Sequence, residues 1–133
     1  MPANIRNKPK NHCMGSWLPV LAFMGLIFYA SSIPGSNIAS VFPFQDIAFH
    51  LSVYSLLALF FSRALRITYP DITVSKNILI TVLFGVFYGL TDEFHQAFVP
   101  LRTASGFDLF IDGLGSIIGT LIFAQLSKAL TDG

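Results

Sequence analysis

The chain has 133 residues, of which 53% are hydrophobic and only 11% are charged, and its mean hydropathy is +0.66. Soluble domains carry roughly 25% charged residues, so this chain has too few polar groups to cover a water-exposed surface, and lipid is the indicated solvent. The net charge of +1 provides no basic field for nucleic acid, and the single cysteine, Cys13, excludes an intramolecular disulfide and a thiolate-based metal centre.

Four apolar stretches follow one another along the chain, over residues 17–33, 44–61, 78–98 and 107–126. Each is near the roughly 20 residues that a helix needs to cross a bilayer. The linkers between them are short and contain helix-breaking residues such as Pro34, Gly35, Pro70 and Pro100. The first stretch also has some features of a signal peptide, but its length and the three further spans favour a transmembrane helix. The sequence therefore predicts an all-α, polytopic membrane bundle of four transmembrane helices.

The distribution of positive charge predicts how this bundle is oriented. Seven of the eight lysines and arginines lie in the amino-terminal arm, the second linker and the tail, and Arg102 alone lies in the third linker. The positive-inside rule then places both termini in the cytoplasm and the first and third linkers outside. We expect a cytoplasmic amino-terminal arm over residues 1–16, one four-helix membrane domain over residues 17–128 and a cytoplasmic tail over residues 129–133.

The remaining polar residues gather at the predicted outer end of the bundle. Five of the seven acidic residues lie there, accompanied by two histidines, a glutamine and an arginine: Asp46, Asp92, Glu93, Asp108, Asp112, His50, His95, Gln96 and Arg102. The uncharged part of the third span, residues 77–91, covers roughly 22 Å at about 1.5 Å per residue, which is short of a roughly 30 Å hydrocarbon core. Its carboxylates therefore lie somewhat below the outer surface, and an ionisable residue inside a membrane is a functional candidate.

Spacing along the helices sorts these residues into stripes, because residues three or four apart share a helix face. There is one stripe on each of the last three spans: Asp46, His50 and Tyr54; Gly85, Gly89, Asp92 and Gln96; and Asp108, Asp112, Gly115 and Gly119. Small residues four apart allow close helix contact in lipid. We therefore expect the third and fourth spans to pack tightly through their glycines and to bring Asp92 toward Asp112.

Local helix stability explains some of the acids better than others. Asp46 and Asp108 lie in first turns, where the helix dipole favours a carboxylate, and Ser105 with Asp108 fits a capping box, so structural and functional roles are equally open. Asp92 and Glu93 lie at a helix carboxyl end, where negative charge is disfavoured, and this favours a functional role. For three basic residues a structural role, as counter-ion or core histidine, also stays open: His50, His95 and Arg102.

Several chemistries are compatible with this set of residues. Paired carboxylates in different environments divide into an acid and a base, and carboxylate with imidazole can also bind a divalent cation. No Ser-His-Asp order, phosphate-cradling loop or His-Glu-x-x-His motif is visible. A glycosidase-like carboxylate pair, acid-assisted phosphoryl chemistry and a proton relay remain open, the cofactor is undetermined, and a divalent cation is one option.

At these residues the chain resembles the VanZ-like family of small membrane proteins, named for a member associated with teicoplanin resistance. The resemblance covers nearly the whole chain from Trp17 onward. It rests on residues 31–34, on Asp46, His50 and Tyr54, on the runs 92–96 and 98–100 with Arg102, and on Asp108, Asp112, Gly115 and Gly119. Two positions depart from the family pattern: Ile47 stands where lysine is frequent, and Leu101 stands where glycine commonly precedes the arginine.

The resemblance implies a multi-pass cell-membrane protein connected with the cell envelope. We hypothesise an enzyme that acts at the outer leaflet on a lipid-linked or other envelope substrate, by hydrolysis or group transfer. Asp92 and Glu93 would form the acid/base pair, assisted by the remaining candidate catalytic residues: Asp46, His50, His95, Asp108 and Asp112. Arg102, Gln96 and Tyr54 would bind the substrate.

The alternative is a non-enzymatic binder, carrier or accessory protein, linked to glycopeptide resistance. The expected partners are membrane lipids and either a lipid-linked envelope precursor or a glycopeptide. Replacing Glu93 with glutamine separates the two hypotheses, because an enzyme should lose turnover whereas a binder should often retain its ligand.

Overall fold

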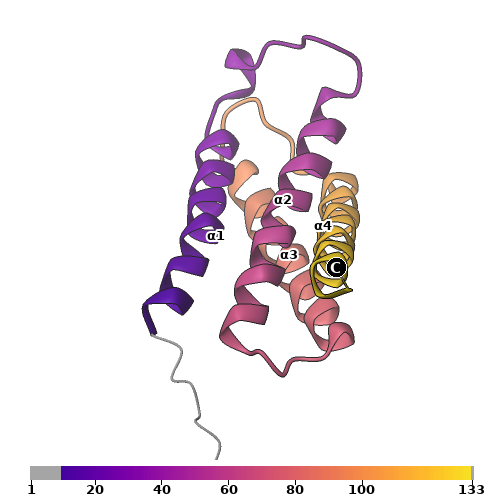
Figure 1. Ribbon diagram of the computed structural model, residues 1–133. Coiled ribbons are helices and arrows are strands. Elements are labelled where there is room, and N and C mark those ends of the chain that lie inside the picture. Colours follow the sequence, from indigo (N-terminus) through magenta and orange to yellow (C-terminus); the bar gives the residue numbers. More distant parts are fainter. Residues whose placement is uncertain (1–9, 133) are drawn as a thin grey trace, which may run out of the picture.

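The computed structural model describes the backbone of residues 10–132 and the side chains of residues 13–130. Its four long helices are α1 (Lys10–Ser31), α2 (Gln45–Thr68), α3 (Val74–Gln96) and α4 (Gly106–Asp132), and a short 3₁₀ turn, η1 (Gly35–Asn37), follows α1 (Figure 1). The described residues form no strand. Each long helix contains a segment long and apolar enough to cross a membrane: Cys13–Ser31, Gln45–Thr68, Val74–Gln96 and Gly106–Leu130. The predicted all-α bundle of four membrane-spanning helices is confirmed.

The helix ends differ from the apolar stretches by several residues. α1 begins at Lys10 and not at residue 17, and α2 continues to Thr68 and not to residue 61. The extension of α2 is amphipathic, because Ala64 and Leu65 are buried while Arg66 is exposed. Its inner face is therefore apolar although charged residues occur in this part of the sequence. At the start of α3, the Thr73 hydroxyl accepts a hydrogen bond from the backbone N–H of Lys76 at 3.3 Å and caps the helix.

α2 occupies the centre of the bundle. It contacts each of the other long helices, most extensively α4, while α1 contacts only α2 and α3 among the described elements (Figure 1). Apolar side chains of α1 and α2 form the buried core, and the rings of Phe61 and Phe84 stack on one another with centroids 4.0 Å apart. α1 is also attached by Trp17, whose Nε1 donates to Thr68 Oγ1 at 3.0 Å.

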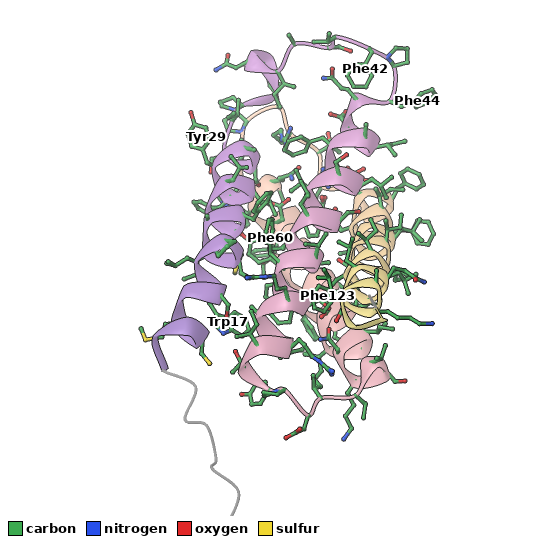
Figure 2. All side chains as sticks on the ribbon, viewed as in Figure 1. Trp17, Tyr29, Phe42, Phe44, Phe60 and Phe123 are labelled. Carbon is green, nitrogen blue, oxygen red and sulfur yellow. The ribbon has the colours of Figure 1, made fainter. Side chains whose placement is uncertain are left out.

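The polarity of the surface and interior is the reverse of that in a soluble protein. Large apolar side chains such as Leu79, Phe87 and Leu126 are more than half exposed, and aromatic rings project outward around the bundle (Figure 2). Inside, a set of polar side chains is 0 to 1% exposed: Ser62, Thr81, Asp112, Ser116 and Thr120. This distribution suits helices that face lipid outward and one another inward.

The two glycine stripes serve different interfaces. Gly85 and Gly89 of α3 face α4, as expected, since a Cβ on Gly89 would meet the Asp112 side chain. Gly115 and Gly119 of α4 instead face α2, where an added Cβ would overlap backbone atoms of Leu51 or Ser55. The expectation that all four glycines join α3 to α4 is therefore corrected. Residues three apart differ by about 60° around a helix, which turns 115 and 119 away from the face of 112 and 116.

Candidate functional site

A cavity of about 940 Å³ lies at the end of the bundle where α2 begins, α3 ends and α4 begins. The end of α1 and the loops at residues 32–44 and 97–105 border it. Five of the candidate residues from the sequence line it: Asp46, His50, Gln96, Arg102 and Asp108. The prediction that polar residues from three spans converge at one end of the bundle thus matches their placement in space.

A buried His–Asp pair stands at the inner side of this cavity. His50 Nδ1 donates to Asp112 Oδ1 at 2.8 Å, and the two side chains are 7% and 0% exposed. The pair joins α2 to α4, because Asp112 reaches across from the first turns of α4. One imidazole nitrogen is thereby fixed on a carboxylate, and Nε2 is left as the nitrogen for a reactant in the cavity that His50 lines.

Glu93 lies behind this pair. Its Oε2 accepts a hydrogen bond from the backbone N–H of Ser105 at 2.6 Å, while its Oε1 is buried and has no hydrogen-bond partner among the described residues. Asp112 Oδ2 is buried and unpartnered in the same way. One ligand-type atom from each of His50, Glu93 and Asp112 lies within 4.8 Å of the others, so these three, among the described residues, could hold a divalent cation.

Asp92 lies close enough to Asp112 for the two charges to interact, as the spacing predicted, but each carboxylate has its own hydrogen-bond partner. Asp92 Oδ2 accepts a hydrogen bond from Gln96 Nε2 at 3.0 Å, one turn further along α3, while Asp112 pairs with His50. Asp92 and Glu93 are both buried, but consecutive residues point about 100° apart on a helix, and each has a different partner. The cluster of His50 and Asp112 therefore includes Glu93 and not Asp92.

His95 and Tyr54 do not line the cavity. His95 Nε2 lies 3.0 Å from Ser32 Oγ, and its ring packs on Phe28 with centroids 4.5 Å apart, so this histidine connects α3 to the end of α1. Because the Ser32 hydroxyl donates to the Phe28 carbonyl, His95 acts as the donor to Ser32. Tyr54 is 1% exposed, and its ring lies parallel to His50 with centroids 6.3 Å apart, so it backs the imidazole.

The loop that carries Arg102 is anchored on the other outer loop. The Gly35 N–H donates to the Pro100 carbonyl at 3.0 Å, and a Cβ on Gly35 would overlap the Leu101 carbonyl. Leu101 has a φ of 58°, the left-handed conformation that glycine adopts without steric cost. Arg102 is half-buried and lines the cavity, and its Nε has no described partner.

Ser105 has a contact that sequence reasoning missed. Its hydroxyl accepts from the Asp108 N–H at 3.3 Å, which is one half of the expected capping box. Its backbone N–H donates to the Glu93 carboxylate. Every residue except proline has a backbone N–H, so the sequence does not indicate which one bonds to Glu93. Ser31 belongs to the motif at residues 31–34, and its buried hydroxyl has no partner among the described residues.

The chain matches the model of a known family. A family model described as VanZ/LLP1 matches residues 16–127, which include all the predicted site residues and most of each long helix. No curated protein and no solved structure matches the chain.

Proposed function

The chain belongs to the VanZ/LLP1 family, and from that premise we propose that it is a cell-envelope enzyme. Its substrate is a lipid-linked or other envelope compound at the outer leaflet of the cell membrane, and its reaction is hydrolysis or group transfer. Both termini lie in the cytoplasm, so the cavity with Arg102 opens outward. The four helices, each long and apolar enough to cross a membrane, support the location in the membrane.

One observation supports the enzyme most directly. A histidine that lines a large cavity is held from behind by a fully buried aspartate, at 2.8 Å. This arrangement is typical of a general base: the carboxylate fixes the ring and stabilises the imidazolium that forms when the other nitrogen takes a proton. A residue that served only helix packing would not need an open cavity on its far side.

The residues divide into roles as follows. His50 Nε2 takes the proton from a water or hydroxyl group as that group attacks the substrate. Asp112 and Glu93 provide negative charge behind the ring. Arg102 binds an anionic group such as a phosphate, since a guanidinium offers several N–H donors to oxyanions. The imidazolium formed at His50 then gives its proton to the leaving group, while Asp46 and Asp108 line the same cavity.

The test is a mass-spectrometric comparison of envelope lipids and cell-wall precursors. Cells carry the wild-type protein, His50→Gln, Glu93→Gln, or no copy of the gene, and His95→Gln is the matched control because His95 lies outside the cavity. We expect one species to accumulate equally in His50→Gln cells and in cells without the gene, and not in the control.

Two results would overturn the assignment. Unchanged lipid pools in the His50→Gln and Glu93→Gln cells, with a drug phenotype that survives, would support the non-enzymatic binder or carrier. Turnover that stops on chelation and returns with Zn²⁺ would reassign His50, Glu93 and Asp112 as metal ligands, because a ligating imidazole cannot also take up the proton.

A further inference from the structure

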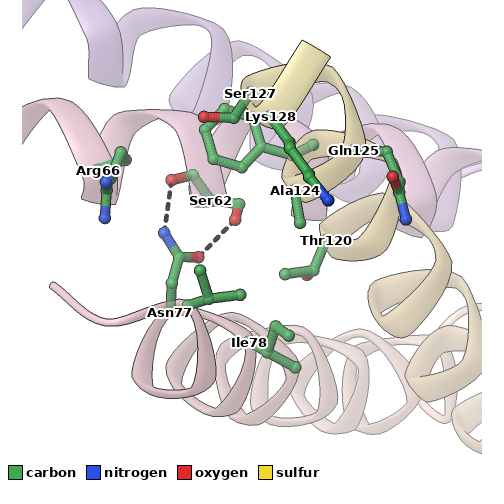
Figure 3. A pocket seen from close by; sticks show the side chains of 11 residues that line it. Ser62, Arg66, Asn77, Ile78, Thr120, Ala124, Gln125, Ser127 and Lys128 are labelled. Carbon is green, nitrogen blue, oxygen red and sulfur yellow. Dashed lines mark hydrogen bonds between the residues drawn. The ribbon is translucent and has the colours of Figure 1, made fainter. Parts of the chain in front are cut away.

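A second cavity lies at the opposite end of the bundle, between the end of α2, the start of α3 and the end of α4 (Figure 3). Its volume is about 370 Å³. The side chains around it come from all three helices, for example Ser62, Asn77 and Thr120 (Figure 3). It shares no residue with the cavity that contains His50.

The charged residues that line this second cavity, among those whose side chains are described, are both cations. Arg66 from α2 and Lys128 from α4 stand on different sides of it (Figure 3), and none of the described lining residues is acidic. Arg66 donates through Nη1 to the Ile72 carbonyl, which holds the guanidinium near the loop between α2 and α3. A guanidinium has five N–H groups, so that bond leaves others for an anion.

The floor of the cavity is polar and rigid. Ser62 Oγ donates to Asn77 Oδ1, Asn77 Nδ2 donates to the Ser62 carbonyl at 3.0 Å, and Thr81 Oγ1 donates to the same amide oxygen at 3.2 Å. All three residues are buried, and such mutual hydrogen bonds satisfy polar groups that would otherwise be costly inside a membrane. The network links α2 to α3 beside the two cations.

The walls of the cavity are apolar. They are formed by Val74, Ile78, Phe123 and Ala124, and Val74 is more than half exposed on the outer surface of the bundle. The cavity thus combines cationic side chains with apolar walls at the end of membrane-spanning helices. A phosphate with attached acyl chains complements both parts, whereas a soluble anion complements only the cations.

We propose that this second cavity binds the phosphate headgroup of an acidic phospholipid. Basic pockets between helices at the cytoplasmic face of membrane proteins are typical sites for such headgroups. Arg66 and Lys128 bind the phosphate oxygens, and the apolar walls take the first part of the acyl chains. The proposal is independent of the chemistry at His50.

The experiment uses the full chain purified in a neutral detergent and mixed with phosphatidylglycerol or with phosphatidylcholine, and native mass spectrometry counts bound lipid. We expect retention of phosphatidylglycerol on the wild type and about fivefold weaker retention for each of Arg66→Gln and Lys128→Gln. Arg63→Gln is the matched control, because Arg63 is an exposed arginine on the same helix that does not line the cavity.

A second variant tests the space and not the charge. Ala124→Trp fills the cavity while leaving both cations in place, so it should also lose phosphatidylglycerol. Helix content is measured by circular dichroism for every variant, and only variants with wild-type helix content are compared. Equal retention by all variants, or retention of phosphatidylcholine to the same extent, would overturn the proposal. Inorganic phosphate that raises the Tm of the lipid-free protein and displaces phosphatidylglycerol would overturn it in favour of a soluble phosphate ligand.

Discussion

The hydrogen bond between His50 and Asp112 is the contact on which the proposed chemistry depends. Asp112→Asn keeps the size of the side chain and removes its charge, so the imidazolium at His50 would lose its counter-ion. We expect turnover to fall by at least about a hundredfold, in the range that general acid–base catalysis contributes. The measurement is conversion of the species identified in the lipid comparison, in membranes with equal amounts of protein.

Asp71→Asn is the control for this substitution. Asp71 is exposed in the loop between α2 and α3, far along the bundle from His50, and its change should leave turnover at the wild-type level. If Asp112→Asn retains full turnover, then His50 does not act as the base.

Leu101 provides a stability prediction that does not involve the reaction. Its left-handed φ of 58° costs a leucine roughly 1–2 kcal/mol, and its side chain is 79% exposed, so little packing would be lost on its removal. Leu101→Gly should therefore stabilise the folded protein by up to about 1 kcal/mol, after the greater flexibility of unfolded glycine is subtracted.

The readout for Leu101→Gly is the Tm of the detergent-solubilised protein. Leu101→Ala is the comparison, because it shortens the side chain and keeps the Cβ that makes the conformation unfavourable. A Tm for Leu101→Gly at or below that of Leu101→Ala would show that the side chain, and not the backbone, determines stability at this position.

At the scale of residues, the sequence predicts which side chains share an end of the bundle but not which of them touch. Charge asymmetry and spacing place His50, Glu93 and Asp112 together. The partner of Asp112 depends on how far α2 and α4 are rotated about their axes, and a single sequence carries no measure of that rotation. The same limit applies to Asp92, which lies near Asp112 as the spacing predicts but bonds to Gln96, a partner that the spacing does not single out.

At the scale of helices, the contact between α2 and α4 sets the geometry of the site. Gly119 lies against the backbone of Ser55, about two turns along α4 from Asp112. Gly119→Ala would place a methyl group where the Ser55 carbonyl stands, and relief requires the two helices to separate. We expect a loss of roughly 1–3 kcal/mol, as for other overpacked interiors, together with reduced turnover.

Gly25→Ala is the matched control for Gly119→Ala. Gly25 is also helical, and a Cβ there meets nothing within 4 Å. Alanine is the better helix former, so Gly25→Ala should be neutral or slightly stabilising. Unfolding in a titration with a denaturing detergent measures both. Equal unfolding midpoints for the two variants would show that the α2–α4 contact tolerates wider spacing.

The glycines also show how far a sequence pattern carries at this scale. The spacing identified all four as close-packing positions, and each of them lies against a neighbouring helix. The spacing does not predict that Gly115 and Gly119 contact α2. Residues spaced along one helix show which face they share, but not which neighbouring helix packs on that face. The number of helices, by contrast, can be predicted by counting apolar segments of about 20 residues, because the thickness and apolar interior of a bilayer determine the length and hydropathy of each spanning helix.

At the scale of the whole molecule, the two ends of the bundle carry opposite charge. Among the described side chains, Arg63, Arg66, Lys76 and Lys128 lie at the end with the second cavity, and the acids that line the His50 cavity lie at the other end. Such asymmetry orients a multi-pass protein during insertion. The cations at the end with the second cavity are also the reason that this cavity complements an anionic headgroup.

Orientation can be measured with the chain's single cysteine removed. In a Cys13→Ser background, Ser40→Cys places a thiol in the exposed loop before α2, and Asp71→Cys places one in the exposed loop after it. With both termini in the cytoplasm, an impermeant maleimide should label Ser40→Cys in intact cells and Asp71→Cys only after permeabilisation. The physical reason is the concentration of lysine and arginine beside Asp71, which is retained on the cytoplasmic side. The reverse labelling would place the His50 cavity at the inner leaflet, where its substrate would have to be a cytoplasmic-face lipid and not an outer-leaflet one.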